Sequence, residues 1–127
     1  MTSTPSNPRD TIAPYFTEFL SEKLHQPLLP KLKNLSAVFY IELTDATRSV
    51  WTLAIKDGML ESIAGAAWPA QCGFKLTHSV FALIVAGTLS PQVAFFKRDV
   101  EIEGDIALGL KLATVLAEFF KRFPWSS

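Results

Sequence analysis

The 127-residue sequence has little of several features that define common protein classes. Its single cysteine, Cys72, excludes an intramolecular disulfide and a zinc site built from several cysteines. The 12 basic and 12 acidic side chains cancel, so there is no basic excess typical of nucleic-acid-binding proteins and no acidic tail. One cysteine also fits a reducing compartment, and we expect a cytoplasmic protein that binds no nucleic acid.

We expect neither a signal peptide nor a membrane-spanning segment in this sequence. The first residues, MTSTPSNPRDT, are polar and rich in proline, whereas a signal peptide has a basic start followed by an apolar run. Residues 76–96 carry no formal charge when His78 is neutral, but Gly87 and Pro91 interrupt them. The dense apolar part, 80–86, is far shorter than the ~20 residues that a bilayer requires. We interpret this stretch as a buried helix followed by a turn, and peripheral membrane contact stays open.

The motifs of common enzymes and metal sites are absent too. There is no G-x-S-x-G, no phosphate-binding glycine loop, no His-x-x-x-His and no pair of cysteines. Of the two histidines, His78 begins a predicted helix, where a capping or core-edge role is expected. Cys72 has no suggested neighbouring base and is interpreted as inert and buried. Glu101 and Glu103 share one strand face, which we expect to be exposed, so the sequence predicts neither an enzyme nor a cofactor or metal site.

What the sequence does have is apolar surface. Apolar residues make up 49% of it, with ten phenylalanines and three tryptophans. This is enough for the core of one domain, predicted over residues 10–127 after a disordered tail at 1–9, and it leaves apolar surface for a ligand or partner.

Hydrophobic spacing predicts the elements of this domain. Residues 11–24 have helical spacing with a cap at Asp10 or Thr11, and 25–32 form a proline-containing connector. Residues 35–43 alternate, with Leu35, Ala37, Phe39, Ile41 and Leu43 on one side, which indicates a strand. Further strands are predicted at 50–55, 59–66, 72–77 and 100–103, with a polar turn after residue 43 and a hairpin turn at 56–58.

Three helices complete the prediction. One spans 78–86 and ends at Gly87, one begins at Pro91 with Ser90 as its cap, and one spans 106–122 with Asp105 as its cap. The order of helix, strand meander, two helices, strand and helix predicts an α+β fold. It would have a mostly antiparallel sheet with helices on one face.

The last predicted helix is unusually apolar. Its polar residues Lys111, Thr114, Glu118 and Lys121 form one narrow stripe, and the apolar surface covers well over half of the circumference. A helix on a sheet commonly has an apolar face of about 100°. The remaining surface therefore faces a lipid ligand, a membrane, a second subunit or the flanking helices, and simple burial without any function explains the pattern equally well.

Residues 35–120 resemble the sterol carrier protein type 2 domain family. The similar segments are CGFKLTHS, VFALIVAGTLSP, QVAFFKRDVEIEGDIALGLKLATVLAEF and the hairpin VWTLAIKDG. The stretch FFKRDVEIEGDIALGL is most similar to bacterial stand-alone members that act as accessory lipid carriers in ubiquinone biosynthesis. The resemblance implies a five-stranded sheet with helices covering one face, an apolar tunnel for a lipid tail, and no catalytic residues.

Several apolar residues are candidates for the lining of such a tunnel. Most lie on three helices that converge over one sheet face, and each is also a candidate for the ordinary core. The predicted ligand-binding residues are Trp51, Phe74, Phe81, Ile84, Val85, Phe95, Phe96, Leu112, Val115, Leu116 and Phe119.

The leading hypothesis is therefore a carrier of a hydrophobic lipid. The ligand would be sterol-like, a fatty acyl group, a phospholipid or a polyprenyl quinone precursor, presented to membrane-associated biosynthetic enzymes, with the last helix as a lid. Basic residues at 97–98, 121–122, Lys31 and Lys33 would face anionic headgroups or simply solvent. The alternative is a non-enzymatic interaction module that uses the apolar helix face for a dimer or complex interface.

Overall fold

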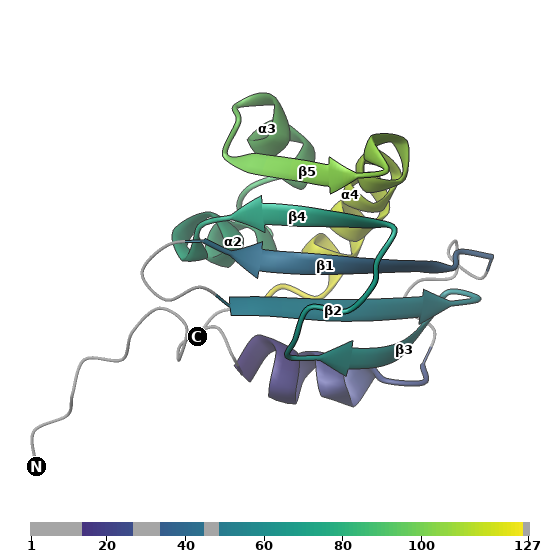
Figure 1. Ribbon diagram of the computed structural model, residues 1–127. Coiled ribbons are helices and arrows are strands. Elements are labelled where there is room, and N and C mark those ends of the chain that lie inside the picture. The colour runs from purple at the N-terminus through teal and green to yellow at the C-terminus, as the bar shows by residue number, and fades with distance from the viewer. Residues whose placement is uncertain (1–13, 27–33, 45–48, 126–127) are drawn as a thin grey trace, which may run out of the picture.

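A five-stranded sheet forms the frame of the molecule. The computed structural model describes residues 14–26, 34–44 and 49–125. Across the sheet the strand order is β3-β2-β1-β4-β5, and all neighbouring strands are antiparallel except β1 and β4 (Figure 1). The strands are β1 (Ala37–Leu43), β2 (Ser49–Lys56), β3 (Met59–Ala64), β4 (Cys72–Leu76) and β5 (Val100–Gly104). The prediction of a mostly antiparallel five-stranded sheet is confirmed.

A two-residue turn joins β2 to β3 at the predicted place. Asp57 and Gly58 both have positive φ, at 52° and 79°. This is the backbone geometry of the hairpin turn whose twist matches that of the flanking strands, and glycine at the second position adopts it without steric cost. The turn therefore fixes the register in which Lys56 pairs with Met59.

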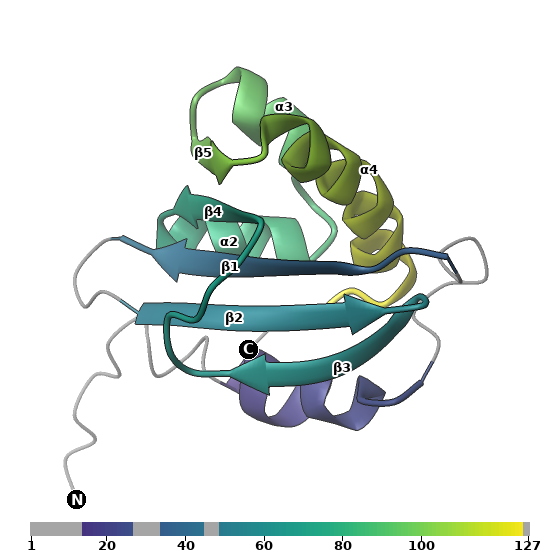
Figure 2. The same cartoon turned by 45° about the vertical axis from the view of Figure 1, so that its right-hand side comes forward.

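The connection from β3 to β4 explains the parallel pair. Residues 65–71 leave the edge strand and cross the face of β2 and β1 to reach the far side of β1 (Figures 1 and 2). Thr52 holds this crossover, because its hydroxyl donates to the Ala66 carbonyl at 2.7 Å and accepts from the Trp68 amide at 3.3 Å. At the end of the crossover, the Gln71 amide donates to the Val38 carbonyl at 2.9 Å.

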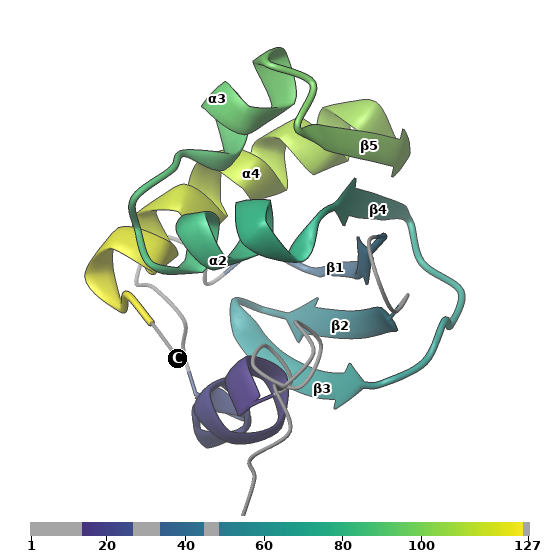
Figure 3. The same cartoon turned by 90° about the vertical axis from the view of Figure 1, so that its left-hand side faces the viewer.

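The helical segments lie on the opposite face of the sheet from this crossover (Figure 3). The regular helices are α2 (His78–Val85), α3 (Pro91–Phe96) and α4 (Ile106–Arg122). An N-terminal helical segment, made of η1 (Tyr15–Phe19) and η2 (Leu20–Lys23), lies beside β2 and β3. This confirms the prediction that helices cover one face.

Caps set the helix limits, largely as the sequence indicates. Asp105 accepts a hydrogen bond from the Leu108 amide at 3.0 Å and starts α4. The cap of α2 is Thr77, whose hydroxyl accepts from the Val80 amide at 3.3 Å. His78 is instead the first helical residue and is buried, which fits the core-edge role and excludes the capping one. Gly87 ends α2 with a φ of 77°, as predicted.

The N-terminal segment differs from the regular amphipathic helix predicted over 11–24. It is a single wide turn followed by a tighter 3-10 turn, and it ends at Leu24, which turns extended and pairs with Leu60. The wide turn lets the consecutive residues Tyr15 and Phe16 both face the sheet, where both are almost fully buried. The predicted tail at 1–9, the cap at Asp10 or Thr11, most of the connector, and most of the polar turn after residue 43 lie outside the described residues.

The two faces of the sheet differ in chemistry as period-two alternation predicts. Phe39, Ile41 and Leu43 of β1 face the helices and are buried, and Val100 and Ile102 of β5 do the same. On α4 the predicted polar stripe is exposed at all four positions. Within the described residues, no helix is both long and apolar enough to span a membrane.

Candidate functional site

The space between the sheet and the helices contains two apolar cavities. Cavity 1 encloses about 40 Å³ between α2, the start of α3, α4 and the strands β1, β4 and β5. Its walls are hydrocarbon throughout. The lining residues are Ile41, Phe74, Leu76, Phe81, Ile84, Pro91, Val100, Ala113, Leu116 and Phe120.

Cavity 2 lies beside cavity 1, toward the N-terminal segment and the β3 edge. It encloses about 30 Å³, and Tyr15 supplies the one hydroxyl among its lining side chains. The lining residues are Tyr15, Leu20, Phe39, Ile41, Leu53, Ile55, Leu60, Phe81, Leu116, Phe119 and Phe120.

Four side chains separate the two cavities and line both of them. They are Ile41 from β1, Phe81 from α2, and Leu116 and Phe120 from α4. A single apolar channel would result only if these side chains moved aside. That channel would run along the helix-covered face from Pro91 to Leu60.

Five of the eleven predicted ligand-binding residues line these cavities. Phe74 and Ile84 line cavity 1, Phe119 lines cavity 2, and Phe81 and Leu116 line both. The sequence patterns therefore identified five residues of α2, α4 and β4 that line the two cavities.

The other six predicted residues lie elsewhere in the structure. Val85 and Leu112 are fully buried in the surrounding core, and Val115 and Phe95 pack against that core while partly exposed. The ring of Trp51 stacks on Phe16 with 4.5 Å between centroids. Phe96 points outward and is 78% exposed.

Sequence reasoning missed most of the floor of the cavities. Phe39, Ile41, Leu53 and Ile55 face the helices from β1 and β2, and Tyr15 covers them from the N-terminal segment. The available signal was the alternation of the strands, which assigns these residues to the helix-covered face. The candidate set was instead drawn mainly from helices.

A small polar cluster borders cavity 1 where α3 meets α4. Gln92 on α3 donates through Nε2 to the Thr114 hydroxyl on α4 at 2.9 Å, and Thr114 donates to the Leu110 carbonyl at 3.0 Å. The Ser90 hydroxyl donates to Gln92 Oε1 at 3.4 Å. Gln92 and Thr114 directly follow Pro91 and Ala113, which line cavity 1, so this bond ties the two helices together beside the cavity.

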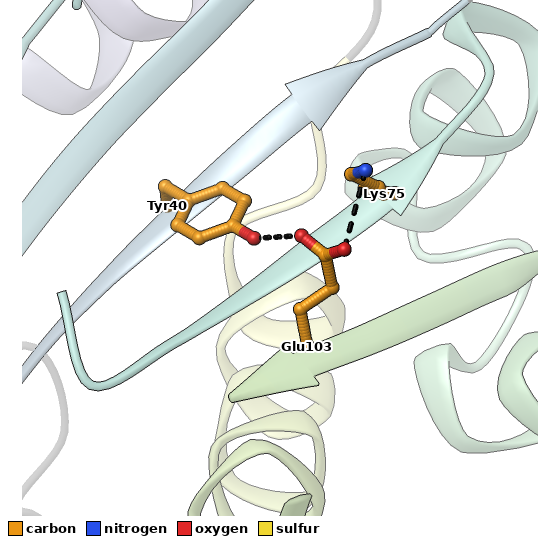
Figure 4. A network of polar contacts seen from close by, with 3 residues as sticks. All are labelled: Tyr40, Lys75 and Glu103. Atoms are coloured by element: carbon orange, nitrogen blue, oxygen red, sulfur yellow. Dashed lines mark hydrogen bonds and ion pairs between the residues drawn. The ribbon is translucent and has the colours of Figure 1, made fainter. Parts of the chain in front are cut away.

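A second polar cluster lies on the opposite face of the sheet (Figure 4). The Tyr40 hydroxyl donates to one oxygen of Glu103, and Lys75 Nζ lies 3.2 Å from the other oxygen. The two donors hold the pKa of Glu103 below its usual range, and burial and the bond to Glu103 hold the pKa of Tyr40 above its own. Glu101 and Glu103 share one face of β5 as predicted; Glu101 is exposed, whereas Glu103 is half-buried and joins three strands.

Cys72 is buried at the start of β4, and burial raises the pKa of its thiol. A buried thiol with a raised pKa carries little thiolate, the reactive form. The described residues contain no group of three or more histidine, cysteine, aspartate or glutamate side chains placed to hold a metal ion. The reactive-group chemistry of the described part of the chain is therefore sparse, whereas its interior is rich in apolar surface.

Comparison with known families decides what this arrangement belongs to. The pattern of the SCP-2 sterol transfer family matches residues 16–117, which include all five strands and most of α4. The chain belongs to the SCP-2 sterol transfer family. The resemblance that the segments from 35 to 120 indicate is thereby confirmed.

Individual relatives are distant in sequence. Human sterol carrier protein 2 is 24% identical over 96 residues, which are 73% of this chain and 18% of the human protein. The chain thus spans less than a fifth of that relative's length.

Solved structures show the same fold in this family. The sterol carrier protein domain 2 of Helicoverpa armigera has a TM-score of 0.65 at 18% identity, covering 98% of this chain and all of that one. Palmitated SCP2L2 from Aedes aegypti has a TM-score of 0.62 at 19% identity, covering 84% and 91%. A structure described as "UbiJ-SCP2 Ubiquinone synthesis protein" has a TM-score of 0.58 at 20% identity, covering 92% and 98%. The five-stranded sheet with helices on one face is therefore a sterol-carrier-like fold.

Proposed function

We propose that this protein binds a lipid by taking its hydrocarbon tail between the sheet and the helices α2 and α4. The observation that carries the proposal is the pair of adjoining apolar cavities, separated by four side chains that line both. Membership of a sterol transfer family supports it. The driving force is removal of the tail from water, which contributes about 0.8 kcal/mol per buried methylene.

The cavities must open to accept a tail. Sites for small molecules commonly enclose ~300–1,000 Å³, whereas the two cavities enclose about 40 and 30 Å³. Binding therefore requires the shared side chains to move aside and a covering helix to shift.

The C-terminal half of α4 is our candidate for the moving part. Its N-terminal half is held close to β5, because a β-carbon at Gly109 would lie 2.5 Å from the Ile102 side chain. The C-terminal half instead supplies Leu116, Phe119 and Phe120 to the cavity walls. A hinge near the middle of the helix would open both cavities without disturbing the sheet.

The structural neighbours indicate the broad class of lipid. One neighbour is described as palmitated and another as a ubiquinone synthesis protein. Both descriptions suit a ligand with a long unbranched or prenyl tail. We propose a fatty acyl lipid or a polyprenyl quinone precursor for this chain, carried to membrane-associated biosynthetic enzymes.

Helix α3 is the proposed contact with the membrane that supplies the lipid. Val93 and Phe96 are exposed to 44% and 78%, and Lys97 and Arg98 follow directly. An apolar anchor beside two cations suits an anionic bilayer surface, where each cation contributes roughly 1 kcal/mol. We expect Phe96→Ala to reduce sedimentation with phosphatidylserine vesicles while leaving binding of a lipid delivered from cyclodextrin unchanged.

The proposal is tested by blocking cavity 1. Ala113→Leu places a larger side chain into its wall, and Ala107→Leu makes the same change at an exposed position of the same helix. We expect wild type and Ala107→Leu to take up a pyrene-labelled alkane and to retain lipid in native mass spectrometry, and Ala113→Leu to lose both. Failure of the wild-type protein to take up any lipid would refute the proposal.

Sedimentation of the same preparations addresses the alternative of an interaction module. A lipid-loaded monomer supports the carrier, and a tight lipid-free dimer that buries α4 supports the module. An interface on α4 would need exposed apolar surface. Ile106, at 44% exposure, is the most exposed large apolar side chain of this helix, so the helix offers little such surface.

A further inference from the structure

The hydroxyl of Tyr15 is buried without a hydrogen-bond partner among the described residues. The side chain is 1% exposed, and it lines cavity 2. A polar group removed from water without a partner destabilises the folded state, so such groups are uncommon and call for a reason. A partner that arrives with a ligand is one such reason.

Aromatic contacts fix the position of this ring. Tyr15 stacks on Phe19 at 5.4 Å between centroids and meets Phe81 and Trp125 edge-on at 5.6 and 5.3 Å. Phe16 packs against it from the neighbouring position at 5.5 Å. With rings around it, the phenol has little freedom to reach another polar group. The ring is therefore held in place in the wall of cavity 2, with its hydroxyl buried beside that cavity.

Water is a poor partner for this hydroxyl. A buried water is normally held by about two to four polar groups. The other side chains that line cavity 2 are leucine, isoleucine and phenylalanine, so they offer no second donor or acceptor. Burial raises the pKa of Tyr15, which keeps the phenol protonated and able to donate.

We propose that Tyr15 donates a hydrogen bond to an uncharged oxygen of the bound lipid, and that it thereby selects neutral oxygen-bearing lipids such as esters, alcohols and quinone precursors. This inference rests on the proposed lipid-binding function and adds to it the position of the polar end. The oxygen lies in cavity 2 against the N-terminal segment, and the tail runs past the shared side chains into cavity 1.

The preference for an uncharged oxygen follows from the lining. None of the described residues that line either cavity carries a charge. Lys23 is nearby in sequence, but it lies over the rings of Phe19 and Phe123, at 5.4 and 4.1 Å from their centroids, and is not part of the lining. An ionised carboxylate would be buried beside one phenol and no cation, which is strongly unfavourable. Moving an ester or alcohol oxygen from water into the cavity costs far less free energy, because that oxygen carries no charge.

The experiment compares two single-hydroxyl variants. The chain has two tyrosines, and Tyr40 donates its hydroxyl to Glu103 on the opposite face of the sheet, so Tyr40→Phe is a matched control for Tyr15→Phe. Binding of methyl palmitate, 1-hexadecanol, hexadecane and palmitate at pH 8, each delivered from cyclodextrin, is measured by displacement of a pyrene-labelled alkane. Thermal unfolding of the lipid-free proteins is measured alongside.

The proposal predicts opposite effects on binding and on stability. Tyr15→Phe should weaken methyl palmitate and hexadecanol about 3- to 10-fold, as expected for one lost hydrogen bond, and leave hexadecane unchanged. It should also raise the unfolding temperature of the lipid-free protein, because an unsatisfied buried hydroxyl is removed. Tyr40→Phe should leave all affinities unchanged and lower the unfolding temperature. In the wild type, palmitate should bind more weakly than its methyl ester.

The outcomes separate this proposal from the function on which it rests. Equal methyl palmitate affinity in wild type and Tyr15→Phe, with lipid uptake intact, would overturn the role of Tyr15 and leave the carrier proposal standing. Tighter binding of palmitate than of its ester would overturn the neutral-lipid preference. Binding of none of the four compounds by the wild type would overturn both. As a measurement without any variant, the ζ-carbon resonance of Tyr15 in [ζ-13C]tyrosine-labelled protein should shift with methyl palmitate and not with hexadecane.

Discussion

The ring of Tyr40 on β1 lies over Gly73 on β4, in the space that a side chain at position 73 would occupy. All three of the nearest atoms to a β-carbon built at Gly73 belong to this ring. Tyr40 and Gly73 are direct neighbours in the parallel pair. The absence of a side chain at Gly73 therefore lets the Tyr40 hydroxyl reach across β4 to Glu103 on β5 (Figure 4).

Replacement of this glycine should destabilise the fold. We expect Gly73→Ala to lower the free energy of unfolding by about 3 kcal/mol, at the upper end of overpacking effects, because the new methyl group displaces a ring on a rigid sheet. Denaturant unfolding measures the change. In a Tyr40→Ala background the same substitution should cost much less, and an equal cost in both backgrounds would show that the ring is not the cause.

The acid limb of the stability curve should depend on Glu103. The hydrogen bonds from Tyr40 and Lys75 lower the pKa of Glu103 in the folded state. Glu103 therefore stabilises the folded state fully above its unfolded pKa of about 4.3. This stabilisation is lost as the pH falls through the folded pKa. We expect the denaturation midpoints of wild type and Glu103→Gln to differ at pH 7, and the difference to shrink as the pH falls below about 4.3 and Glu103 becomes protonated.

The neighbouring carboxylate provides the control for that experiment. Glu101 lies on the same face of β5 and is exposed. Glu101→Gln should change the midpoint at pH 7 much less than Glu103→Gln does. A gap between wild type and Glu103→Gln that stays constant through the acid transition would contradict the assigned role of Glu103.

The regular elements were predictable because their signals are local. Asp105 and the apolar spacing after it set the limits of α4, and Asp57 with Gly58 sets the β2–β3 hairpin. Alternation along β1 correctly assigned its core face. Each of these outcomes depends on residues close together in the chain, which is where sequence patterns carry information.

The features that the sequence did not predict depend on distant contacts. The pairing of β4 with β1 requires the crossover at 65–71, which Thr52 holds from β2. The π-helical turn that begins at Tyr15 allows two consecutive aromatic residues, Tyr15 and Phe16, to be buried together. Helical spacing likewise predicts which face of a helix is apolar but not how deeply that face is buried. Phe96 was therefore grouped with Phe81, although Phe96 is exposed and Phe81 is buried.

Cys72 should react slowly in the folded protein. It is 1% exposed and burial raises the pKa of its thiol, so both access and thiolate content are low. We expect slow reaction with a disulfide reagent at pH 8 and rapid, complete reaction in denaturant. Thr88→Cys in a Cys72→Ala background places a thiol at an exposed position and should react rapidly without denaturant. Equal rates for the two folded proteins would contradict the burial of Cys72.

The hydrogen bond between Gln92 and Thr114 should control the rate of lipid entry. It joins α3 to α4 at 2.9 Å beside Pro91 and Ala113, which line cavity 1. Thr114→Val keeps the side-chain shape and removes the acceptor. Because the bond is exposed to water, the free energy of unfolding should change by less than about 1 kcal/mol.

Kinetics distinguish this role from a purely structural one. Stopped-flow uptake of a pyrene-labelled alkane should be faster for Thr114→Val, with release accelerated to the same extent and the equilibrium affinity unchanged. Gln92→Ala should have the same effect, and the double variant should show no further increase, since both substitutions break one bond. Thr88→Val, an equivalent change in the exposed loop after α2, should behave as the wild type. Uptake at the wild-type rate in Thr114→Val would show that this bond does not limit lipid entry, so that the C-terminal half of α4 would open without breaking it.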